Sequence, residues 1–223
     1  LISDYCKKLR LGKSIATNYL QIEARTHEEF LVKLLQLEIE NRNISRKNRY
    51  LKQAKFEIVK SFQGYDFQNV QIPQSITLEA LKNGEFIDRE ENLILYGPVG
   101  TGKTHLATAI GVQACSQEKK VRFFRTVTLV NELIQAKEEG KLDRLLKQLN
   151  KLDLLICDEW GYIPLDREGS QLLFQLIADC YEKRSVIITT NLEFSKWNGI
   201  FYDDKLTSAI IDRLVHHCHL IVF

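Results

Sequence analysis

The octapeptide GPVGTGKT at residues 97–104 constrains the fold more than any other part of the chain. It follows the apolar run Leu93–Tyr96 and precedes a segment of helical character, so the spacing GxxxxGK[ST] falls between a strand and a helix. In such a turn the backbone N–H groups point inward and cradle phosphates, while the helix N-terminus adds positive potential. This context predicts a binding site for a nucleoside triphosphate, because a chance glycine-rich turn rarely combines strand, spacing, lysine and threonine.

Two side chains of this turn have distinct expected roles. Lys103 is expected to reach the β- and γ-phosphates of ATP, and the Thr104 hydroxyl is expected to ligate Mg²⁺. The expected nucleotide-binding residues are Gly97, Pro98, Val99, Gly100, Thr101, Gly102, Lys103, Thr104, His105 and Asp158.

A second motif, Leu154–Glu159, is an apolar strand pattern that ends in two acids. Two desolvated carboxylates at a strand end are costly unless a cation compensates. We expect Asp158 to hold Mg²⁺ opposite Thr104, and Glu159 to polarise the attacking water as a general base. Cys157, inside the strand, is expected to be a small core residue.

A third apolar strand pattern, Val186–Thr190, is followed by Asn191. Ligands of parallel sheets lie at the carboxyl ends of strands, which would place the Asn191 amide beside the γ-phosphate. An asparagine at this position is also typical of a turn that caps the next segment, and the residue alone leaves both interpretations open.

From residue 93 onward, expected strands alternate with expected helices, which predicts an α/β fold with a mostly parallel sheet covered by helices on both faces. The first sixty residues read as helical, broken at Gly12, and Gly64–Pro73 reads as a connecting loop before a short helix over 75–83. The expected strands are 93–96, 121–125, 154–157, 186–190 and 220–223, and the expected helices are 103–116, 127–149, 169–182 and 204–217.

Within the helical front end, Thr26 and Glu29 have the form of a capping box. Phe30, Leu34 and Leu37 then share a helix face, which Leu31 and Leu35 are expected to widen.

The charge of the chain is divided unevenly. Residues 1–60 contain 13 Lys+Arg and 7 Asp+Glu, whereas the remainder is acidic overall, although the net charge is +2. A basic helical stretch suits the phosphate backbone of a DNA duplex, yet such a stripe is also common on surfaces that contact no nucleic acid. The candidate DNA-binding residues are Arg42, Arg46, Lys47, Arg49, Lys52 and Lys55.

Composition excludes several classes of protein. The five cysteines are scattered and contain no CxxC pair, which argues against a disulfide framework and favours a reducing cytoplasm. No apolar run has the length needed to span a membrane, and no signal peptide opens the sequence. Because Met is absent even at position 1, we expect a fragment or a chain that has lost its Met positions.

Together, GPVGTGKT, LLICDE, IITTN and the segment Ile211–Leu214 resemble the AAA+ ATPases of the helicase-loader (DnaC/IstB) clade. Further stretches, 157–165, 191–197, 212–217 and 49–56, resemble the IstB-type transposition helper ATPases of bacterial insertion sequences. The similarity therefore extends over nearly the whole chain.

The resemblance implies roles for two further residues. Asn191 matches the sensor-1 position, and Arg213 matches the arginine finger that acts on ATP bound by a neighbouring subunit. Without the resemblance, Arg213 would read as an ordinary surface residue of a helix. Glu159, Asn191 and Arg213 are thus the expected catalytic residues.

The resemblance also implies a domain plan and a function. We expect a small helical domain over 1–62 and a P-loop AAA+ domain over 63–223. The implied protein binds ATP and Mg²⁺ in a bacterial cytoplasm, self-associates into a ring or spiral on double-stranded DNA, hydrolyses ATP and assists a cognate transposase in target selection. Many AAA+ proteins continue into a helical lid, whereas this sequence stops at Phe223, so the lid is absent or cut off.

Three alternatives stay open. A replicative helicase loader shares the nucleotide chemistry but serves a hexameric helicase. A nucleotide-gated interaction module with negligible turnover would need none of Glu159, Asn191 and Arg213. A P-loop kinase is the third alternative, although the Asp-Glu pair and the strand-end Asn suit a water molecule better than the acceptor hydroxyl of a kinase.

Two other segments carry weaker signals. Residues 126–150 are long for one crossover, and by resemblance Arg122 and Arg125 would join other basic side chains in touching DNA there. His216–His219 is expected to serve core and capping roles rather than a metal, since adjacent residues point apart and no partner ligand stands out.

Overall fold

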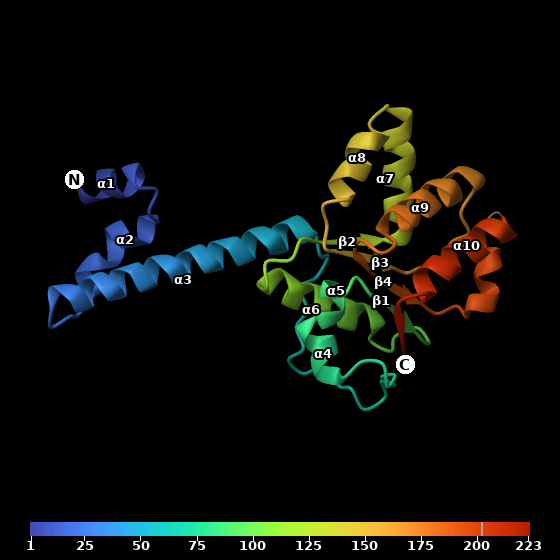
Figure 1. Ribbon diagram of the computed structural model, residues 1–223, viewed down its shortest axis with the longest axis horizontal. Helices are drawn as coiled ribbons and strands as arrows, with labels where there is room; N and C mark the ends of the chain where they lie inside the picture. The colour runs from blue at the N-terminus through green and yellow to red at the C-terminus, as the bar shows by residue number, and fades with distance from the viewer. Residues whose placement is uncertain (202) are drawn as a thin grey trace. The chain divides into compact units, whose positions relative to one another are not determined.

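The computed structural model describes residues 1–201 and 203–223, which divide into two compact units, residues 1–49 and 50–223. The predicted boundary at residue 62 stays a prediction. Figure 1 labels helices and strands of both units.

The first unit is helical, as expected. It contains α1 (Ile2–Lys8), α2 (Lys13–Asn18), the 3₁₀ helix η1 (Tyr19–Gln21) and the beginning of α3 (His27–Ala54). The Thr26 hydroxyl accepts a hydrogen bond from the Glu29 N–H at 3.1 Å, as the capping box predicts, whereas the Glu29 carboxylate accepts from the Arg25 N–H rather than from Thr26.

The expectation that Leu31 and Leu35 widen the apolar face of α3 is wrong. Their side chains are 55% and 57% exposed, while Phe30, Leu34 and Leu37 are half-buried. The short helices of this unit cover only one stripe of α3. A carboxylate takes the most buried position there instead, since Glu38 is 5% exposed and accepts hydrogen bonds from the Gly12 N–H.

The second unit is an α/β domain. After the end of α3 and the short helices α4 (Leu78–Asn83) and α5 (Glu85–Asp88), strands and helices alternate as expected. The elements are β1 (Asn92–Tyr96), α6 (Lys103–Ser116), β2 (Val121–Arg125), α7 (Thr126–Glu138), α8 (Leu142–Leu149), β3 (Leu154–Asp158), α9 (Arg167–Cys180), β4 (Ser185–Thr190), the 3₁₀ helix η2 (Phe194–Gly199), α10 (Asp204–Val215) and β5 (Cys218–Val222).

The five strands form one sheet in the order β2-β3-β4-β1-β5, and every neighbouring pair is parallel. The prediction of a parallel sheet is therefore confirmed. Gln71, in the expected loop, adds one antiparallel bridge to Val222 of the edge strand β5. Because β1 lies between β4 and β5, and β4 lies beside β3, the ends of β1, β4 and β3 are neighbours.

Helices cover both faces of this sheet, because successive side chains of each strand point to opposite faces. Leu93 and Leu95 pack with α4, α5 and α6, whereas Ile94 packs in the core that α7, α8, α9 and α10 cover. Figure 1 shows these two helical layers on either side of the strands. Every residue of β3 and β4 is buried, which explains their uninterrupted apolar sequence patterns.

One expected helix is in fact two. The helix expected over 127–149 is divided into α7 and α8 at Gly140, whose φ of +67° lies in the left-handed region that ends helices. Gly140 thus converts a long crossover into a helical hairpin. No helix in the described part of the chain combines the length and apolarity needed to cross a bilayer.

The buried Asn92 connects three parts of the domain, and its removal is expected to destabilise the fold. Its amide donates to the Leu214 carbonyl at 3.1 Å and accepts from the Val186 N–H at 2.9 Å. Asn92→Ala should lower the free energy of unfolding in urea by about 2–4 kcal/mol, because both buried partners lose a hydrogen bond. The exposed Asn83→Ala should change it by less than about 0.5 kcal/mol. Equal effects of the two substitutions would contradict this account.

Candidate nucleotide-binding site

The glycine turn lies between the carboxyl end of β1 and the start of α6 at Lys103. Gly100 and Gly102 have φ values of +81° and +96°, which residues with a side chain rarely adopt. The Gly97 N–H donates to the Thr190 carbonyl at the end of β4. The positive φ angles that glycine permits and the Gly97 contact to β4 together fix the loop that leads into the N-terminus of α6, where phosphates are typically bound.

Lys103 is 8% exposed and its ammonium lies over the loop. The ammonium donates to the backbone oxygens of Gly97, at 2.8 Å, and of Pro98. Burial lowers the pKa of Lys103, although the nearby Asp158 carboxylate opposes this shift. A cation so poorly solvated gains more from an incoming phosphate than an exposed lysine would.

Asp158, at the end of β3, is held by hydroxyls from two other elements. Thr104 donates to its carboxylate at 2.9 Å and 3.1 Å, and Thr189 of β4 donates to the same group. The residue is 3% exposed. Hard oxygen donors of this kind, a hydroxyl and a carboxylate, are the ligands that Mg²⁺ prefers, so Thr104 and Asp158 fit the expected magnesium ion.

Glu159 adopts a left-handed backbone conformation, with φ of +58°, that is costly for a residue with a side chain. Its N–H donates to the Thr189 hydroxyl at 3.0 Å, while its side chain remains 41% exposed. The Arg125 Nε lies 3.8 Å from the Glu159 carboxylate, and Arg125 also binds Glu57. Hydrogen bonding to Glu57 and the charge of Glu159 raise the pKa of Arg125.

These groups surround a cavity of about 330 Å³ at the carboxyl edge of the sheet. The structure thus brings together Lys103, Thr104, Asp158 and Glu159, as the sequence predicts. The cavity is lined by Val99, Gly100, Gly102, Lys103, Thr104, His105, Glu159, Tyr162, Thr189 and Thr190.

Asn191 and Arg213 are not among the residues that line this cavity. Asn191 directly follows β4, and its side-chain oxygen is buried without a hydrogen-bond partner in the described part of the chain. Arg213 lies on α10, where its guanidinium donates to the Ala209 carbonyl at 2.7 Å and lies 5.0 Å from the centre of the Phe174 ring. The expected roles of both residues stay predictions.

Sequence reasoning missed three contributors to the site. Thr189 read only as part of a buried strand, although its hydroxyl joins Asp158 to Glu159. Arg125 reaches Glu159 because β2 pairs with β3 in a register that sets Arg125 opposite Asp158. Tyr65, in the expected connecting loop, donates to the Gly102 carbonyl at 3.4 Å and contacts the His105 ring, and burial raises its pKa to about 12.

The six candidate DNA-binding side chains are all exposed. Arg42 is engaged within the first unit, since it pairs with Glu38 and donates to the Arg10 carbonyl. A cavity of about 370 Å³ in the same unit is lined by Gly12, Glu38, Asn41, Arg42, Ser45, Arg46 and Arg49.

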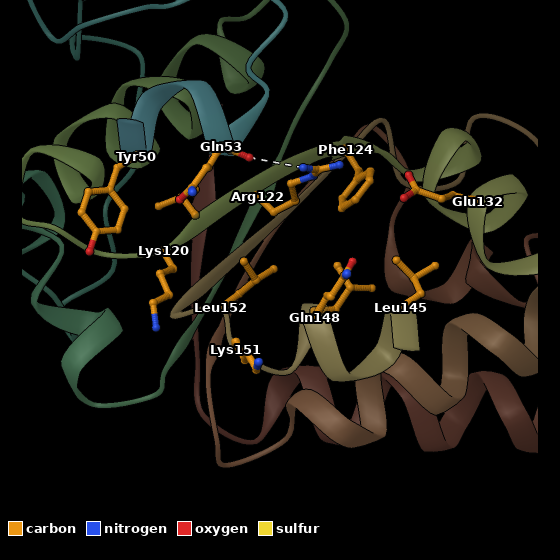
Figure 2. Close-up of a pocket in the computed structure, with 12 residues that line it drawn as sticks. Tyr50, Gln53, Lys120, Arg122, Phe124, Glu132, Leu145, Gln148, Lys151 and Leu152 are labelled. Carbon is orange, nitrogen blue, oxygen red and sulfur yellow. Dashed lines mark hydrogen bonds between the residues drawn. The ribbon is translucent and has the colours of Figure 1, made fainter. Parts of the chain in front are cut away.

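Arg122 has a different environment from the one expected of a DNA contact. It lines a separate cavity of about 380 Å³ between edge strand β2, α8 and the end of α3 (Figure 2). Its guanidinium lies over the Phe124 ring and donates to the Gln53 carbonyl, and burial lowers its pKa. These contacts hold the Arg122 guanidinium against the protein, and its expected contact with DNA stays a prediction.

The remaining sequence expectations have mixed outcomes. Cys157 is fully buried, as expected for a small core residue. The core role expected within residues 216–219 holds for His219, which is 6% exposed, and the capping role holds for His216, which is the C-cap residue of α10. The core role is wrong for His216 and His217, which are exposed.

All five cysteines have free thiols. Burial raises the pKa of four of them, Cys115, Cys157, Cys180 and Cys218.

A parallel sheet in the order β2-β3-β4-β1-β5, with the glycine turn after its β1 and the acidic pair after the β3 strand, defines a P-loop protein of the AAA+ class. Comparison with known proteins identifies the family. Residues 7–223 match the family of IstB-like ATP binding proteins, and the chain belongs to it.

Curated relatives carry consistent descriptions. The chain is 41% identical over 191 residues to the insertion sequence IS21 putative ATP-binding protein of Pseudomonas aeruginosa, which covers 86% of this chain and 72% of the relative. It is 39% identical over 196 residues to the IS232 counterpart of Bacillus thuringiensis subsp. berliner, and the match covers 86% of this chain and 77% of the relative. The IS5376 counterpart of Geobacillus stearothermophilus is 36% identical over 221 residues, covering 97% and 88%.

Solved structures support the fold. The structure of DnaI matches with a TM-score of 0.59 at 17% identity, covering 73% of this chain and 90% of that one. The structure of the DnaC helicase loader matches with a TM-score of 0.53 at 22% identity, and the match covers 78% of this chain and 98% of the loader chain. AMPPCP-bound DnaA from Aquifex aeolicus matches with a TM-score of 0.54 at 24% identity, covering 65% and 43%. At these identities the likeness shows a shared AAA+ fold.

Removing the buried ammonium should abolish tight nucleotide binding. Lys103→Met is expected to weaken the binding of a fluorescent ATP analogue by about 10–100-fold, because charge-assisted hydrogen bonds to the phosphates are lost. The exposed Lys120, at the opposite edge of the sheet, provides a matched control, and Lys120→Met should bind normally. Unchanged affinity of Lys103→Met in fluorescence titrations would contradict the assignment of the site.

Proposed function

We propose that this protein is an ATPase that assembles on double-stranded DNA with bound Mg·ATP and assists a transposase in choosing and joining a target site. The observation that carries the proposal is that Lys103, Thr104 and Glu159 line one cavity, with the Asp158 carboxylate hydrogen-bonded to the Thr104 hydroxyl. A protein that only binds nucleotide needs the first three groups but has no use for a carboxylate beside the γ-phosphate.

Magnesium would be held by Thr104 and Asp158, and it would neutralise charge on the β- and γ-phosphates. Lys103 binds the same phosphates through its desolvated ammonium. Glu159 orients and deprotonates a water molecule, and its fixed N–H contact to Thr189 sets the position of the carboxylate. Asn191, at the neighbouring strand end, assists in positioning that water as the sensor-1 residue.

Hydrolysis is proposed to require a second subunit. Arg213 lies on α10 and is not among the residues that line the cavity of its own subunit, so in this proposal it acts on ATP bound by a neighbour. A cation supplied in this way stabilises the charge of the transferring phosphoryl group. Turnover therefore depends on assembly, and the assembly on DNA depends on bound ATP.

The proposed DNA contacts are the exposed basic side chains of α3 and the residue after it. Lys47, Lys52 and Lys55 are solvated ammonium groups suited to phosphates, with no requirement for a particular base sequence. The names of the curated relatives, all ATP-binding proteins of insertion sequences, support transposition as the process served. A helicase loader of the same fold is the competing proposal, and it predicts a preference for single-stranded DNA or for a helicase.

Blocking hydrolysis without blocking binding should trap the assembly on DNA. Glu159→Gln is expected to bind ATP normally, to lose about 10²–10⁴-fold in turnover, and to remain on a duplex in ATP. The rate of dissociation from an immobilised duplex measures the lifetime of the assembly on DNA. Glu79→Gln, an exposed substitution on α4, should behave as the unmodified protein. Rapid release of Glu159→Gln in ATP would rule out hydrolysis as the step that resets the assembly.

The role of Arg213 can be separated from nucleotide binding by mixing subunits. In saturating ATP, Arg213→Ala should lose about 10³–10⁵-fold in turnover, and Lys103→Met should assemble but be inactive because it lacks the ammonium that binds the β- and γ-phosphates. A mixture of the two is expected to regain turnover, since Lys103→Met subunits supply Arg213 to sites on Arg213→Ala subunits.

The matched control for this mixture is Lys205→Ala, an exposed substitution on the same helix, which should retain full activity. If mixtures stay as inactive as their components, or if Arg213→Ala alone hydrolyses ATP at the normal rate, Arg213 is not a finger that acts between subunits.

A further inference from the structure

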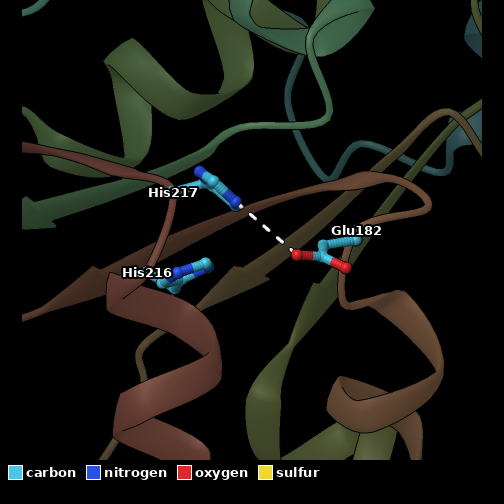
Figure 3. Close-up of side chains that lie close together, drawn as sticks. All are labelled: Glu182, His216 and His217. Atoms are coloured by element: carbon cyan, nitrogen blue, oxygen red, sulfur yellow. Dashed lines mark ion pairs between the residues drawn. The ribbon is translucent and has the colours of Figure 1, made fainter.

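A cluster of metal-ligating side chains lies far from the nucleotide cavity within the second unit. Glu182 follows α9, and His216 and His217 follow α10, and one ligand atom from each lies within 4.8 Å of the other two (Figure 3). These turns lead into the amino ends of β4 and β5, whereas the nucleotide cavity lies at the carboxyl ends of the strands. The cluster therefore has no part in the ATP chemistry.

The donors of this cluster suit a transition-metal ion, contrary to the sequence expectation, because Glu182 supplies the partner ligand and the two adjacent histidines lie close enough to share it. His217 Nε2 lies 3.7 Å from the Glu182 carboxylate, close to the roughly 3.3 Å that separates two ligands on a tetrahedral ion with bonds of about 2.0 Å. Two imidazoles and one carboxylate are a ligand set that favours Zn²⁺ and its neighbours over Mg²⁺ or Ca²⁺.

The backbone around the cluster also favours a cation. Helices α9 and α10 both end there, at Cys180 and Val215, and pack against each other. The carboxyl end of a helix carries partial negative charge, so two such ends attract a positive ion. This polarity is a property of the fold, independent of the three ligands.

Two local features prepare the ligands. Glu182 has φ of +52°, a left-handed conformation that costs conformational energy in a residue with a side chain, and it presents its carboxylate to His217. The Tyr181 hydroxyl lies 2.9 Å from His216 Nδ1. When Nδ1–H donates to that hydroxyl, the lone pair remains on Nε2, which is how second partners orient ligating histidines.

We propose that Glu182, His216 and His217 bind one Zn²⁺ ion, with water completing the coordination. The ion bridges the ends of α9 and α10. Because Phe174 of α9 lies under Arg213 of α10, the bound ion would stiffen the helix pair that carries Arg213 and leave the nucleotide cavity unchanged. The binding of the metal itself requires neither ATP nor DNA.

The test is a calorimetric titration of Zn²⁺ into metal-stripped, nucleotide-free protein. One site is expected, and Glu182→Gln, His216→Ala and His217→Ala should each weaken it by at least about tenfold. All three side chains are exposed, so the variants are expected to fold normally, which circular dichroism checks. His27→Ala removes an exposed histidine in the first unit and is the matched control, with unchanged affinity.

Cobalt provides a second, structural measurement, because tetrahedral Co²⁺ has a visible absorption that depends on its ligands. The unmodified protein and His27→Ala should develop this absorption with one equivalent of Co²⁺, and the double substitution His216→Ala/His217→Ala should not. Equal Zn²⁺ affinity of the double variant and the unmodified protein would overturn the proposal. Loss of Zn²⁺ binding in His27→Ala would overturn it as well.

Discussion

Asp158 ends strand β3 with a nearly buried carboxylate that accepts hydrogen bonds from Thr104 and Thr189. These hydroxyls belong to α6 and β4, so one acidic group connects α6, β3 and β4 at the nucleotide site. The arrangement exists only because β1, β4 and β3 are neighbours in a parallel sheet and end at the same edge. A shift of one residue in this register would turn Asp158 toward the opposite face.

The parallel arrangement of the strands gives the sheet two edges of different chemistry, one at the carboxyl ends and one at the amino ends of the strands. At the carboxyl edge, backbone N–H groups, Lys103 and the acidic pair suit a phosphorylated ligand with its metal ion. At the amino edge, the carboxyl ends of α9 and α10 meet Glu182 and two histidines, which suits a cation bound by the protein alone. Arg213 lies in the last turn of α10, three residues before His216, so this helix end connects the proposed catalysis in trans with the proposed metal site.

The sequence predicted the elements whose signals are local and periodic. The strand 121–125 and the helix 103–116 match the structure at both ends, because Val121, Phe123 and Phe124 favour a strand and the glycine turn sets where the helix begins. Pairings between distant segments were not predictable, since nothing in the sequence near Thr189 or Tyr65 indicates that they contact Asp158 or Gly102. The exposure of Leu35 was missed for the same reason, because periodicity identifies an apolar face but not what covers it. Gly140 was visible in the sequence, and its left-handed conformation explains why one expected helix became a hairpin.

The central claim is that bound ATP organises this protein into an assembly on duplex DNA. Electron microscopy of the protein with a long duplex, and with single-stranded DNA of the same length, each with and without Mg·ATP, tests it most directly. The account predicts ordered oligomers only on the duplex and only with Mg·ATP. Assemblies that form on single strands alone, or equally well without nucleotide, would contradict the account and favour a helicase loader or a nucleotide-independent DNA-binding protein.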